Sequence, residues 1–201
     1  VSEEAKTENY VMLESVSGSY ASGGLVLLVC WLVTVVLVVA AVIDGWKLKV
    51  PNWITFPMIL SGWVASTAMF GFSGLAWSLV GTAVGLALLM PAYAIGGMGA
   101  GDVKLLAGVG AWVGAAHTFW AFLISAVVGG IIAMIMVLYR RKWRHHRLQF
   151  WAILTEIFTI RDPNELSAIA ANRKNTMLLL PYGIPIAIGT IGYFAATGML
   201  L

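Results

Sequence analysis

A glycine-rich stretch that ends in a carboxylate is the part of this sequence best suited to chemistry. Residues 96–101 hold four glycines, Asp102 follows at once, and strongly apolar runs lie on both sides. Glycine allows positive φ and a close approach of the backbone, so a tight turn is expected here. A carboxylate next to a membrane-embedded segment is costly and is a functional candidate by default. The chemistry that Asp102 could perform depends on whether a second polar group lies beside it.

The composition indicates an integral membrane protein. Of the 201 residues, 60% are hydrophobic and only 10% are charged, and the mean hydropathy is +0.90. A soluble domain would carry about 25% charged residues. The single cysteine, Cys30, cannot form an internal disulfide, and with no nearby histidine it is interpreted as a packing residue. A structural zinc site is not expected, because the chain has no CxxC pair.

The apolar runs predict an all-α fold, a polytopic membrane helix bundle with six transmembrane helices. About 20 apolar residues in a helix cross the hydrocarbon core. The expected spans are 25–43, 53–70, 75–95, 102–113, 118–139 and 176–200. The fourth is short for a crossing, and a glycine turn at 71–74 separates the second from the third. Gly81 and Gly85 form a GxxxG pair, which is either a helix-packing motif or a chance match.

Two segments lie outside the predicted spans. Residues 1–24 are polar and acidic and lack the pattern of a signal peptide, so they are interpreted as an exposed extracytoplasmic tail. Residues 25–201 form the membrane domain, within which 140–175 is a basic loop. Its apolar part, 148–160, is too short to cross and is predicted to be an interfacial helix.

Charge sets the orientation of the predicted bundle. With six spans, 11 of the 12 basic residues share one face, and only Lys6 lies on the other. Cytoplasmic loops carry the Lys/Arg excess. The face with Lys47, Lys49, Lys104 and the 140–174 cluster is therefore assigned to the cytoplasm, and the N-terminus to the other side.

The same topology supplies a partner for Asp102. Asp44 ends the first predicted span and Asp102 begins the fourth, both at the cytoplasmic face. Two carboxylates within a few ångströms cannot both ionise cheaply, so one keeps a proton. Water held between them can attack an amide carbonyl, which is the arrangement of aspartic proteases. The glycines before Asp102 would leave room for an extended substrate backbone.

These residues resemble a known family. Gly99-Ala100-Gly101-Asp102 matches the GxGD motif of the type IV prepilin peptidases, the segment from Asp44 to Asn52 is similar to theirs, and Pro181-Tyr182-Gly183-Ile184-Pro185 resembles the start of their last helix. The resemblance implies a membrane aspartic endopeptidase that cuts the basic leader from a prepilin or pseudopilin at the cytoplasmic side of the bacterial inner membrane. It implies Asp44 and Asp102 as the catalytic aspartates, with Gly99, Gly101, Lys104, Pro181 and Gly183 as substrate-binding or motif residues. No cofactor or metal is expected.

The chain also departs from the larger members of that family. It lacks their cysteine-rich insert and extra N-terminal spans, so it is more similar to the small peptidases of tight-adherence (Flp pilus) systems. N-methyltransferase activity, which belongs to the larger members, is not expected. Besides the substrate, the lipid bilayer is the expected partner, and nucleic-acid binding is not expected because no matching fold accompanies the basic cluster.

Other interpretations stay open at this point. The chain could be a GxGD intramembrane protease of another class, although it has no Pro-Ala-Leu motif, or a transporter or assembly scaffold whose aspartates bind a proton or cation. Single residues also have structural interpretations, with Asp44 as a snorkelling helix end, Asp102 as a helix cap, Lys104 as a membrane-edge anchor, His117 as a structural residue, and His145 and His146 as solvated loop residues.

Overall fold

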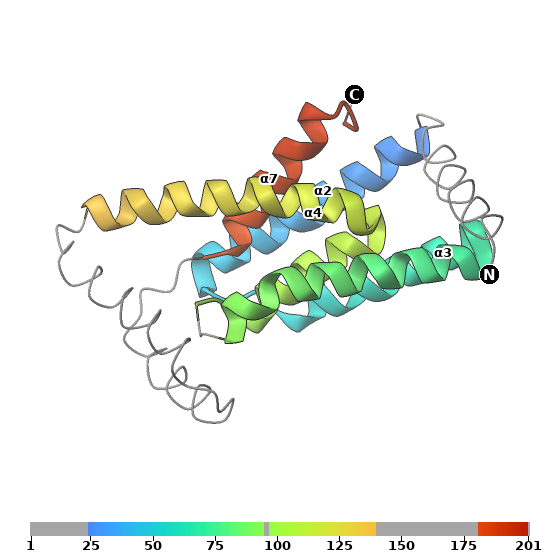
Figure 1. The fold of residues 1–201 in the computed structure, drawn as a ribbon, viewed down its shortest axis with the longest axis horizontal. Helices are drawn as coiled ribbons and strands as arrows, with labels where there is room; N and C mark the ends of the chain where they lie inside the picture. The colour runs from blue at the N-terminus through green and yellow to red at the C-terminus, as the bar shows by residue number, and fades with distance from the viewer. Residues whose placement is uncertain (1–23, 95–96, 140–180, 201) are drawn as a thin grey trace, which may run out of the picture.

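The part of the chain that can be described is all-helical. The computed structural model describes residues 24–94, 97–139 and 181–200. They form α2 (Gly24–Lys47), α3 (Asn52–Ala94), α4 (Ala100–Tyr139) and α7 (Gly183–Ala196), with no strand in these ranges (Figure 1). The predicted fold class is confirmed at this level. The acidic tail, the 140–175 loop with its predicted interfacial helix, His145 and His146 lie outside the described residues.

Within the described ranges, three helices are long and apolar enough to cross a membrane. They are α2, α3 and the part of α4 from Ala100 to Met136, while α7 is a shorter apolar helix. With 43 residues, α3 would be about 65 Å long if straight. That is about twice the thickness of the hydrocarbon core, so a single straight crossing by α3 is excluded.

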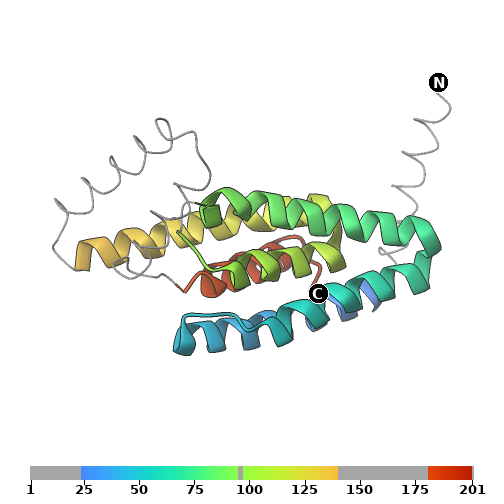
Figure 2. The same cartoon turned by 90° about the horizontal axis from the view of Figure 1, so that it is seen from below.

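Single glycines break the two longest helices. Gly71 has φ 64° and ψ −144° inside α3, and Gly114 has φ 76° and ψ 176° inside α4. Figure 1 and Figure 2 show the ribbon doubling back within each helix, so the halves of α3 lie side by side. The Trp63 indole N–H joins those halves by donating a hydrogen bond to Thr82 Oγ1 at 3.0 Å. The breaks fall where the sequence predicted turns, while the count of six crossings stays a prediction.

Glycine contacts bring α3 and α4 together. A Cβ atom on Gly81 would meet the backbone of Gly110, and one on Gly110 would meet the backbone of Gly81. At Gly85 a Cβ atom would lie 2.6 Å from the Leu106 carbonyl oxygen and 2.8 Å from Ala107 Cα. The Gly81–Gly85 pair is therefore a packing motif and not a chance match, because both positions lie against the first half of α4.

The last helix, α7, packs against both α2 and α4. Gly189 of α7 lies against the backbone of Ser125, and His117 Nδ1 lies 2.8 Å from the Tyr193 hydroxyl. Fully buried apolar residues fill the core between the helices, among them Leu37, Leu105, Leu106 and Phe194. Cys30 is also fully buried in this core, as expected for a packing residue.

Several predicted boundaries shift by a few residues. α2 continues one turn beyond Asp44 to Lys47, so the carboxylate lies inside the helix. α4 begins at Ala100, because the Asp102 side chain caps its first turn by accepting a hydrogen bond from the Gly99 N–H. α7 begins at Gly183 and ends at Ala196, inside the predicted last span.

Gly189→Ala is expected to destabilise the bundle by about 1–3 kcal/mol, because the added methyl group would overlap the Ser125 backbone, which cannot rotate away. Thermal unfolding in detergent measures the loss. Gly192→Ala is the matched control in the same helix, since a Cβ atom there has nothing within 4 Å. Both changes gain the same helix propensity. Equal stabilities of the two variants would contradict the close contact of α7 with α4.

Candidate functional site

Asp44 is buried near the end of α2 and bound by the start of α7. Its side chain is only 2% exposed, and its Oδ2 accepts a hydrogen bond of 2.8 Å from the Gly183 N–H. The first N–H groups of a helix have no partner within the helix and carry partial positive charge, so they favour a carboxylate. The interpretation of Asp44 as a snorkelling helix end is therefore wrong, because the carboxylate faces another helix.

Gly183 has no space for a side chain. A Cβ atom there would lie 2.9 Å from Asp44 Oδ2 and 3.0 Å from Asp44 Cβ. The residues around it form the first turn of α7, in which the Pro181 carbonyl accepts a hydrogen bond from the Ile184 N–H at 3.2 Å. Of the candidate residues near the C-terminus, Gly183 thus contacts Asp44 directly, and Pro181 shapes the turn that presents its N–H.

Asp102 lies in the first turn of α4 and is 5% exposed. Its Oδ2 accepts a hydrogen bond from the Gly99 N–H at 3.1 Å, and its own N–H donates to the Gly99 carbonyl at 3.2 Å. Within the described ranges, Asp102 Oδ1 is buried without a hydrogen-bond partner. An unpaired buried oxygen costs free energy. Capping therefore accounts for one oxygen of Asp102 and leaves the other available to a ligand or water.

The fold brings the two aspartates to the same end of the bundle. Asp44 comes from α2, Asp102 from α4, and the two carboxyl groups are near enough to interact electrostatically. Tyr182, the residue before Gly183, is likewise within electrostatic range of Asp102. Three elements distant in sequence therefore meet at this site, namely the end of α2, the start of α4 and the start of α7.

Gly101 is packed against Val50, whereas the sequence suggested open space for a substrate backbone there. A Cβ atom there would lie 2.5 Å from the Val50 carbonyl oxygen and 3.0 Å from Val50 Cβ, and Val50 is only 3% exposed. The space at Gly101 is thus taken by the segment between α2 and α3, and the expected room for a substrate backbone is not at this glycine. Gly99 serves the site through its N–H, which holds Asp102.

The Lys104 side chain lies against the start of α3. Its ammonium group donates a hydrogen bond of 3.1 Å to Asn52 Oδ1 and lies 4.7 Å from the centroid of the Phe56 ring. The side chain therefore links α4 to α3 beside the segment that covers Gly101. Lys104 therefore has a packing role between two helices, which its interpretation as a membrane-edge anchor did not include.

Tyr182 is the neighbour of the site that the sequence did not single out. Its ring lies near Gly129 of α4, where a Cβ atom would be 3.7 Å from Tyr182 Cε1. Its place in the proline- and glycine-containing motif 181–185 was visible in the sequence, but its closeness to Asp102 was not.

His117 lies beside α7, far along that helix from the candidate site. His117 contacts Tyr193, ten residues along α7 from Gly183 and thus about 15 Å further along the helix. It therefore lies away from the aspartates. In the described part of the chain, no three His, Cys, Asp or Glu side chains come close enough together to hold a metal ion.

Lys104→Met is expected to lower the free energy of unfolding by about 0.5–1 kcal/mol, because it removes a partly exposed hydrogen bond and a cation–π contact. Denaturant titration in detergent measures the change. Lys104→Arg keeps a cation above Phe56 and is expected to retain part of the contact energy. A loss above about 3 kcal/mol would indicate a buried ion pair instead.

The chain is similar in sequence to a known family of proteins. A family model described as the type IV leader peptidase family matches residues 17–134, which include both aspartates and more than half of the chain. The Prepilin leader peptidase/N-methyltransferase of Aeromonas hydrophila is 32% identical over 123 residues, which are 58% of this chain and 41% of that protein. The protein of the same name from Aeromonas salmonicida (strain A449) gives the same identity and coverage.

The alignment to these relatives therefore covers less than half of their length. No solved structure matches the chain. The matched family region ends before α7, which supplies the Gly183 N–H to Asp44. On the extent of the family match, the chain belongs to the type IV leader peptidase family.

Proposed function

We propose that this protein is a membrane aspartic endopeptidase that removes the basic leader from a prepilin or pseudopilin, with Asp44 and Asp102 as its catalytic residues. The observation that carries the proposal is the convergence of two buried carboxylates from α2 and α4 at the start of α7. Family membership and the printed names of the relatives, which are prepilin leader peptidases, support this substrate class.

In the proposed mechanism, the two aspartates share one proton and hold a water molecule between them. The ionised carboxylate takes a proton from the water while the water oxygen attacks the scissile carbonyl carbon. The protonated carboxyl donates its proton to the carbonyl oxygen. The carboxyl that took the proton from water then gives it to the amine nitrogen as the C–N bond breaks, and a hydroxyl of the tetrahedral intermediate gives its proton to the other carboxylate. The products are one new carboxyl terminus and one new amino terminus, and the pair regains its single proton.

Two backbone N–H groups would hold the two carboxyl groups in fixed positions. Gly183 binds one oxygen of Asp44, and Gly99 binds one oxygen of Asp102. Each carboxyl would thereby keep its second oxygen for the water and substrate. Preorganised donors that need not move during the reaction are an effective source of catalysis, which gives both glycines a positioning role.

The location of the site is also part of the proposal. Lys47, Lys49 and Lys104 lie close in sequence to the two aspartates, and the excess of basic residues marks the cytoplasmic side. Cleavage is therefore proposed at the cytoplasmic face of the bacterial inner membrane. A prepilin of the Flp type is the first substrate that we propose to test.

Asp44→Asn and Asp102→Asn are each expected to reduce leader removal at least about 100-fold, because an amide cannot shuttle the proton. Either asparagine can still accept the backbone hydrogen bond, so the bundle should stay folded. Co-expression with a tagged prepilin and gel electrophoresis measures processing. Asp102→Glu should also lose most activity, since one added methylene group moves the carboxyl from the shared water.

The control for these variants is Asp162→Asn, which changes the third and last aspartate of the chain and should process normally. Normal processing by Asp44→Asn or Asp102→Asn would eliminate the assignment of a catalytic pair. If both variants fold but lose a proton or cation flux instead of cleavage, the protein is a transporter.

Gly183→Ala is expected to lower kcat about 100-fold, because the methyl group would displace the Asp44 carboxyl by a few tenths of an ångström or more. Gly192→Ala, in the same helix with open space around it, serves as the control. Rates of leader removal from purified prepilin in detergent provide the measurement. Unchanged kcat in Gly183→Ala would show that the close fit of Gly183 against Asp44 is not needed for cleavage.

A further inference from the structure

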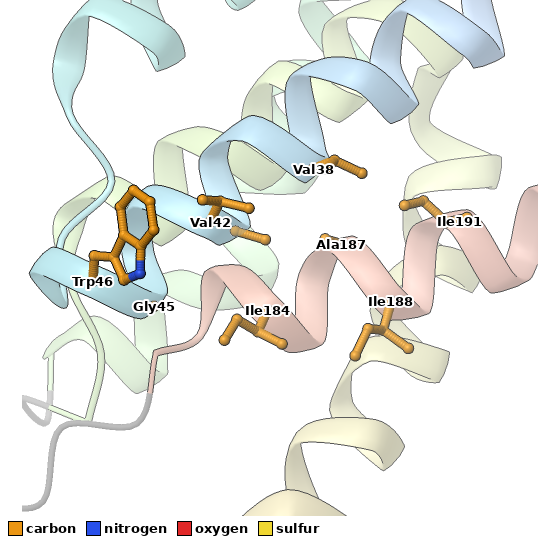
Figure 3. Close-up of a pocket in the computed structure, with 9 residues that line it drawn as sticks. Val38, Val42, Gly45, Trp46, Ile184, Ala187, Ile188 and Ile191 are labelled. Carbon is orange, nitrogen blue, oxygen red and sulfur yellow. The ribbon is translucent and has the colours of Figure 1, made fainter.

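An apolar groove lies between α2 and α7 and leads away from the aspartates. It has a volume of about 610 Å³, and none of its lining residues carries an ionisable side chain. Figure 3 shows Val38, Val42 and Trp46 on the α2 side and Ile184, Ala187 and Ile191 on the α7 side. From Val38 to Trp46 the groove follows about 12 Å of α2, which is roughly two helical turns.

The groove begins at the candidate site. Two of its lining residues, Gly45 and Ile184, directly follow Asp44 and Gly183 in the chain, and Asp44 and Gly183 are joined by the hydrogen bond described above. A molecule that fills the groove from end to end therefore reaches the backbone beside the Asp44 carboxyl. This continuity distinguishes the groove from the apolar helix surfaces that face lipid elsewhere.

The floor of the groove suits a helix better than a lipid chain. Ala41 and Gly45 lie four residues apart on α2, the spacing that lets a second helix approach closely. The described residues do not account for the glycine, because a Cβ atom on Gly45 would make only an ordinary contact, 3.6 Å from Ile184 Cδ1. At Gly81 and Gly189, by contrast, the neighbouring helix leaves no space for a Cβ atom.

The groove is also open on one side. The side chains of Val42, Trp46 and Ile188 are 48%, 84% and 50% exposed. An occupant that buried them would gain packing contacts with both α2 and α7 while its end lay next to the acids. A lipid tail could fill the same volume, but it brings no amide bond to the site.

We infer that the α2–α7 groove binds an apolar helical segment of the substrate that adjoins the scissile bond. This inference rests on the proposed function and adds to it where the membrane part of the substrate lies. The groove would set which amide reaches the acids, because an occupant seated against Ala41 and Gly45 fixes the distance between its helix and Asp44. Cleavage would then be specific for a bond at the end of an apolar segment.

Cysteine cross-linking in lipid vesicles tests the contact. The probe is a prepilin with a leader followed by an apolar segment carrying single cysteines, and Asp102→Asn keeps it uncut. Val42→Cys and Ile188→Cys are expected to form disulfides with it. Val39→Cys is the matched control, since Val39 is 43% exposed on α2 but does not line the groove. The native Cys30 is fully buried.

Binding of the same uncut prepilin provides a second readout. Val42→Trp, which fills the groove, should raise Kd at least about tenfold. Val39→Trp should change Kd by no more than about twofold. Equal cross-linking at positions 39 and 42, or an unchanged Kd in a folded Val42→Trp protein, would overturn the inference and leave lipid as the occupant.

The two proposals can fail separately. If the wild-type protein cleaves the prepilin but no disulfide forms at Val42→Cys, the groove assignment is wrong and the peptidase stands. If disulfides form at Val42→Cys and Ile188→Cys but the wild-type protein never cleaves the bound chain, the docking surface stands and the proposed peptidase activity falls.

Discussion

The hydrogen bond from the Gly183 N–H to the Asp44 carboxyl connects the two ends of the described chain and defines the site. Its partners lie 139 residues apart, and the bond is buried. It exists because the first turn of a helix has N–H groups without partners within the helix, and because glycine leaves no Cβ atom between α7 and Asp44. The bond makes α7 part of the site, although the matched family region ends at residue 134.

Glycine contacts hold the remaining helices at the spacing that this site needs. The backbones of Gly81 and Gly110 touch, Gly85 lies on Ala107, and Gly189 lies on Ser125. In lipid the hydrophobic effect does little to associate helices, so close backbone packing provides much of the attraction. The first half of α4, which carries Asp102, is thereby fixed against α3, and the second half of α4 is fixed against α7. Asp44 and Asp102 are thus positioned by glycine contacts between helices in which neither aspartate takes part.

Burying two carboxyl groups near one another costs stability. Asp44 and Asp102 are almost fully buried, and one oxygen of Asp102 has no hydrogen-bond partner among the described residues. Each carboxyl recovers part of the cost through one backbone N–H. A chain selected for stability alone would replace such a pair by apolar residues. Local cost of this kind is usual at sites where a protein does chemistry, and the groove beside Asp44 adds uncovered apolar surface at the same place.

The sequence by itself determined that the chain is helical, where the long helices break, and which two aspartates border the apolar runs. Long apolar runs favour helices in lipid because every backbone polar group must be satisfied internally, and Gly71 and Gly114 interrupt α3 and α4 near the predicted turns. Only the tertiary structure decided that Gly183 binds Asp44, that Val50 fills the space at Gly101, that Lys104 binds Asn52, and that α2 and α7 leave a groove. The physical reason is the separation along the chain over which each effect acts. Hydropathy and turn preference act between near neighbours in the chain, whereas these contacts depend on how distant helices pack, which one sequence does not specify locally.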